Sequence, residues 1–67
     1  MIKVTKEQFF QVIYRLDLDV HPRPEKEASY WELRNRQLVG ITTPGYMLQG
    51  EKTYSLADNF KDDIKWI

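Results

Sequence analysis

The chain carries a helix-start signal near each end, with an aromatic segment punctuated by turns between the two signals. At the first signal, Thr5 is followed three residues later by Gln8, which is the spacing of a capping box. Apolar residues then recur with the period of one helical face, at Phe9, Val12, Ile13 and Leu16. This pattern predicts a helix from Lys6 to Leu16.

Phe10 and Tyr14 form a second apolar pair on the same predicted helix, four residues apart. Residues at this spacing are neighbours on a helix surface, and this pair lies beside the main apolar face. The two sets together are wider than packing against one surface requires. We therefore expect this helix to contact two surfaces.

The second start signal lies at Ser55 and Asp58, which repeat the cap spacing. An apolar stripe follows at helical intervals, at Leu56, Phe60, Ile64 and Ile67. The stripe predicts a C-terminal helix from Leu56 to about Lys65.

The middle of the chain predicts strands and turns. The two prolines in residues 21–24 fix their own backbone angles and disfavour helix before them, which predicts a stiff extended connector continuing through residues 25–27. Residues 29–34 and 37–42 are rich in aromatic and β-branched side chains and predict a hairpin connected at Asn35 and Arg36. Arg36 is a poor residue for a type I′ turn, so a longer or bulged loop stays open. Residues 43–46 predict a type II turn and residues 52–55 a last strand.

These segments predict one α+β domain over residues 1–67: an N-terminal helix, a three-stranded antiparallel sheet and a C-terminal helix, with both helices on one sheet face. The other face has no cover left in the chain. A two-residue hairpin loop pairs Trp31 with Gly40 and Leu33 with Leu38, and it places Tyr30, Val39 and Ile41 on the opposite side. Either the Tyr30 set or the Trp31 and Leu33 set forms the uncovered face. A homodimer through the uncovered face or through the edge strands is the predicted solution, and a solvated face is the alternative.

Composition excludes several classes of protein. Ten basic and ten acidic residues give zero formal charge, which disfavours a general electrostatic binder of nucleic acid. No apolar run approaches the roughly 18 residues of a membrane span, so we expect no membrane partner and a cytoplasmic location. The chain has no cysteine, and its one ligand-like cluster, Asp17, Asp19 and His21, is an incomplete shell beside a proline. We expect no metal, no cofactor and no enzymatic activity.

Two binding hypotheses follow. The first is a non-enzymatic protein-interaction or regulatory module with an unknown partner, which presents Tyr46, Met47 and Leu48 on the loop between two glycines. The alternative is a nucleic-acid binder that uses the hairpin tip, with Arg34, Asn35 and Arg36 beside Tyr30. Balanced charge makes the second hypothesis the weaker one.

Overall fold

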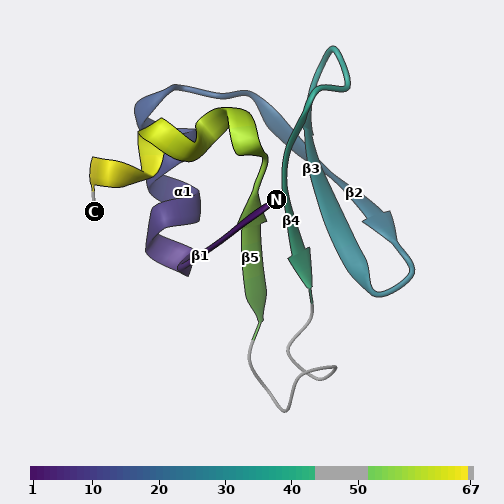
Figure 1. Cartoon of the computed structure of the whole chain (residues 1–67). Helices are drawn as coiled ribbons and strands as arrows, with labels where there is room; N and C mark the ends of the chain where they lie inside the picture. The colour runs from purple at the N-terminus through teal and green to yellow at the C-terminus, as the bar shows by residue number, and fades with distance from the viewer. Residues whose placement is uncertain (44–51, 67) are drawn as a thin grey trace.

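The structure, a computed structural model, describes residues 1–43 and 52–66 (Figure 1). Within these residues, five antiparallel strands form one sheet in the order β1-β5-β4-β3-β2. The elements follow the chain as β1 (Ile2–Val4), helix α1 (Lys6–Arg15), β2 (Val20–Glu25), β3 (Ala28–Leu33), β4 (Leu38–Thr43), β5 (Thr53–Leu56) and the 3-10 helix η2 (Asp58–Trp66). Figure 1 shows η2 crossing α1 beside the β5 end of the sheet.

The prediction of a three-stranded sheet is wrong, because two further strands extend it, one at each edge. At one edge β1 pairs with β5, so Ile2 lies opposite Leu56. At the other edge the predicted connector is strand β2, which pairs with β3 along its full length and contains Pro22 and Pro24. An edge strand donates only its alternate amides to the ladder, so two prolines at alternate positions are compatible with it. They also protect this edge from pairing with another chain.

The prediction of a C-terminal α-helix beginning at Leu56 is also wrong. Ser55 does not cap a helix, because it lies inside β5, opposite Lys3 on one side and Ile41 on the other. Leu56 is buried from the last position of that strand. The chain then turns into the 3-10 helix η2, and Phe60 enters the core from its first turn.

Helix α1 matches its sequence prediction closely. The Gln8 amide donates to Thr5 Oγ1 at 3.1 Å, and the Thr5 amide donates to Gln8 Oε1 at 2.9 Å, which completes the capping box. Arg15 is the last helical residue and Leu16 is the C-cap. Asp17 follows with a φ of 51°, in the left-handed region that ends many helices.

The β3–β4 hairpin keeps the predicted register at Trp31 and Gly40 but has a longer loop. The Leu33 amide donates to the Gln37 carbonyl at 2.9 Å, which leaves three residues in the loop, and the last of them, Arg36, has a φ of 69°. A type I turn followed by a left-handed residue is a common three-residue hairpin loop. The prediction that Leu33 lies opposite Leu38 is wrong, because Leu38 pairs with Glu32.

A β-bulge near the start of β4 changes which face Val39 occupies. The register shifts between Trp31 and Glu32, so that β4 has one extra residue between Gly40 and Leu38. That residue, Val39, is fully buried in the core and does not share the open face with Tyr30 and Ile41 as strict alternation predicts.

The core lies between α1, η2 and one face of the sheet. Its buried apolar members are Val4, Phe9, Val12, Val39, Tyr54, Leu56 and Phe60. Phe9 lies directly over Gly40: a Cβ atom on that glycine would be 2.6 Å from Phe9 Cε2 and would overlap the Ser55 carbonyl oxygen. Because Gly40 has no side chain, the Phe9 ring packs directly against the backbone of β4 at this position.

Candidate functional site

The most exposed aromatic side chains of the described residues lie on the outer side of α1. Phe10 is 42% exposed and Tyr14 is 84% exposed, and Leu16 at the end of the helix is also exposed. Isolated apolar residues are common on protein surfaces, but neighbouring aromatic residues on one helix face are typical of a binding surface. Phe10 and Tyr14 are the pair that the sequence places beside the main helical face.

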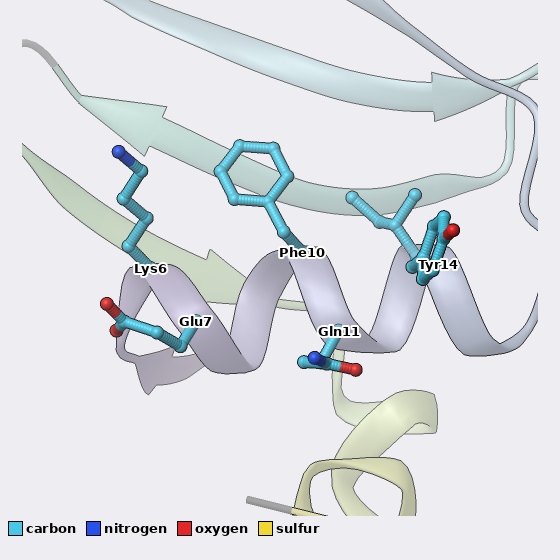
Figure 2. A pocket seen from close by; sticks show the side chains of 6 residues that line it. Lys6, Glu7, Phe10, Gln11 and Tyr14 are labelled. Carbon is cyan, nitrogen blue, oxygen red and sulfur yellow. The ribbon is translucent and has the colours of Figure 1, made fainter.

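A hollow of about 480 Å³ lies against this side of the helix (Figure 2). We call its lining the α1 surface; it consists of Lys6, Glu7, Phe10, Gln11, Ile13 and Tyr14. Figure 2 shows Lys6 and Phe10 extending from the same side of α1, while Gln11 leaves the helix on a different side. The hollow is therefore an open surface with an aromatic centre and polar residues around it.

Contacts from within the core hold Phe10 in place. Its ring packs edge to face against Phe9, with centroids 5.3 Å apart, and against Tyr54, with centroids 5.9 Å apart. Offset and edge-to-face pairs of this kind are favourable for aromatic rings. Phe10 thus presents an ordered apolar edge to solvent, and a partner that covered it would restrict little further motion.

Charged and polar groups surround this aromatic centre. Lys6 and Glu7 lie in the first turn of α1, and Arg15 lies in the last turn. Arg15 Nε donates to Gln11 Oε1 at 3.1 Å, which ties two of these groups together on the helix. An apolar centre with a polar rim is the usual composition of a protein–protein interface.

The sheet face away from the helices is polar where the sequence predicted an apolar surface. Arg23 lies 5.0 Å from the centre of the Tyr30 ring, and its guanidinium also pairs with Glu25 at 2.8 Å and with Glu32 at 3.2 Å. Because Val39 is in the core, Ile41 is left among these polar neighbours. The reason for predicting dimerisation through this face is therefore lost, although self-association itself stays a prediction.

Of the residues of the nucleic-acid hypothesis, Arg34, Asn35 and Arg36 lie together in the loop after β3, whereas Tyr30 lies within β3, opposite Ile41. Arg34 Nε donates to Asp19 Oδ2 at 2.6 Å, so a carboxylate offsets its charge. Asn35 Oδ1 accepts from the Gln37 amide at 3.0 Å and stabilises the loop. Arg36 is exposed in its left-handed conformation, and nothing in this arrangement creates a basic field with an aromatic platform.

Two candidates from the sequence remain. Tyr46, Met47 and Leu48, with residues 44–46 of the predicted type II turn, lie outside the described residues. His21 Nε2 is 3.3 Å from Asp19 Oδ1, but Asp19 also binds Arg34, and no three acidic or histidine side chains of the described residues are grouped to hold a metal ion. In the same part of the chain, no helix has the length and apolar character needed to cross a membrane.

The sequence contained the signal for the α1 surface without identifying it as a site. The i, i+4 spacing of Phe10 and Tyr14 indicated a second contact surface, and the structure leaves that surface uncovered. No protein-family model, curated protein or solved structure matches this chain.

Proposed function

We propose that this chain is a small non-enzymatic protein-interaction module of the cytoplasm that binds its partner through the α1 surface. The observation that carries the proposal is the exposed pair of Phe10 and Tyr14, centred on a hollow and rimmed by polar residues. Aromatic side chains dominate the energetics of protein interfaces, and charged residues are usually found at the rim. The absence of cysteine fits a reducing compartment.

The α1 surface is also suited to binding by its rigidity. The capping box fixes the start of the helix, and Phe10 packs on two buried rings. A surface that is ordered before binding loses little conformational entropy when a partner covers it. A partner therefore gains apolar contact with Phe10 and Tyr14 at a small ordering cost.

The test is site-specific photo-crosslinking. A photoreactive phenylalanine analogue replaces Tyr14 in one variant and Glu27 in a control variant, because Glu27 is exposed in the turn between β2 and β3, away from α1. Both variants are irradiated as purified protein and in cells that express them, and the adducts are identified by mass spectrometry.

We expect a defined adduct, either with a second copy or with another protein, from position 14 and none from position 27. Adducts of equal yield from both positions would indicate nonspecific collisions and contradict the proposal. A folded variant that gives no adduct from position 14 in either setting would also contradict it.

A further inference from the structure

We draw no further inference here: the strongest candidate, the exposed aromatic surface of α1 at Phe10 and Tyr14, belongs to the site already described, and nothing in the part of the chain that the structure describes shows what covers it.

Discussion

Phe9 and Phe10 are neighbours in α1 with identical side chains, yet Phe9 is fully buried and Phe10 is 42% exposed. Phe9 rests on Gly40 and contacts the Trp31 and Tyr54 rings, whereas Phe10 covers the edge of this cluster and faces solvent. The inner flank of α1, which includes Phe9, faces the sheet and makes the contacts that stabilise the fold. The outer flank, which includes Phe10 and Tyr14, leaves aromatic surface exposed to solvent. The comparison separates stability from binding within one helix, and five substitutions, with one control, test it.

The largest expected effect is that of Phe9→Ala. Removing a fully buried aromatic ring costs about 3–5 kcal/mol of unfolding free energy, which is comparable to the whole stability of a small domain. Phe10→Ala removes only edge contacts and should cost about 1 kcal/mol. Urea denaturation followed by circular dichroism measures both. Equal losses for the two variants would break the distinction between the flanks.

Gly40→Ala tests the close packing of Phe9 against the backbone at Gly40. The added Cβ atom would lie 2.6 Å from Phe9 Cε2 and would overlap the backbone oxygen of Ser55, so the sheet or the helix must shift. Overpacking of this kind costs about 1–3 kcal/mol. The same denaturation experiment measures the loss. A variant as stable as the parent would show that Phe9 does not rest closely on this glycine.

Thr5→Ala tests the helix start on which both flanks depend. The substitution removes the acceptor for the Gln8 amide, and loss of an N-cap costs about 1 kcal/mol. Thr5→Ser keeps the hydroxyl and serves as the matched control. If the serine variant loses as much stability as the alanine variant, the capping hydrogen bond is not the cause.

The smallest expected effect on stability is that of Tyr14→Ser. The side chain is 84% exposed, so its removal should change the unfolding free energy by less than about 0.5 kcal/mol. The same variant should no longer bind the partner that crosslinks from position 14. A large loss of stability would show that Tyr14 contributes to the core, and unchanged binding would remove Tyr14 from the interface.

Sequence patterns predicted α1 and the β3–β4 hairpin because their signals are local. The Thr5 and Gln8 side chains cap their own helix, and Trp31 reaches Gly40 through one short loop. A longer or bulged loop was left open as an alternative because arginine is unfavourable at a type I′ turn, and Arg36 adopts the left-handed conformation that closes a three-residue loop. Each of these features depends on residues within about ten positions of each other.

The candidate site was only partly predictable. The spacing of Phe10 and Tyr14 indicated a second surface of the helix, but helical spacing does not reveal whether another part of the chain covers that surface. The hairpin tip looked suited to nucleic acid because Arg34 and Arg36 are only two residues apart, with Asn35 between them. Asp19, fifteen residues before Arg34, offsets one of those charges, and no local pattern announces that contact.

The sequence by itself determined where α1 begins and ends and that β3 and β4 form a hairpin with Trp31 opposite Gly40, because capping, helical periodicity and a short hairpin loop act between residues close in sequence. Tertiary structure alone decided that Ile2–Val4 and Val20–Glu25 become edge strands, that the last strand continues through Leu56 where a helix was predicted to begin, and that Val39 turns into the core. The physical reason is that strand pairing joins residues as distant as Ile2 and Leu56, and the hydrogen bonds and burial gained there outweigh the local preference of either segment.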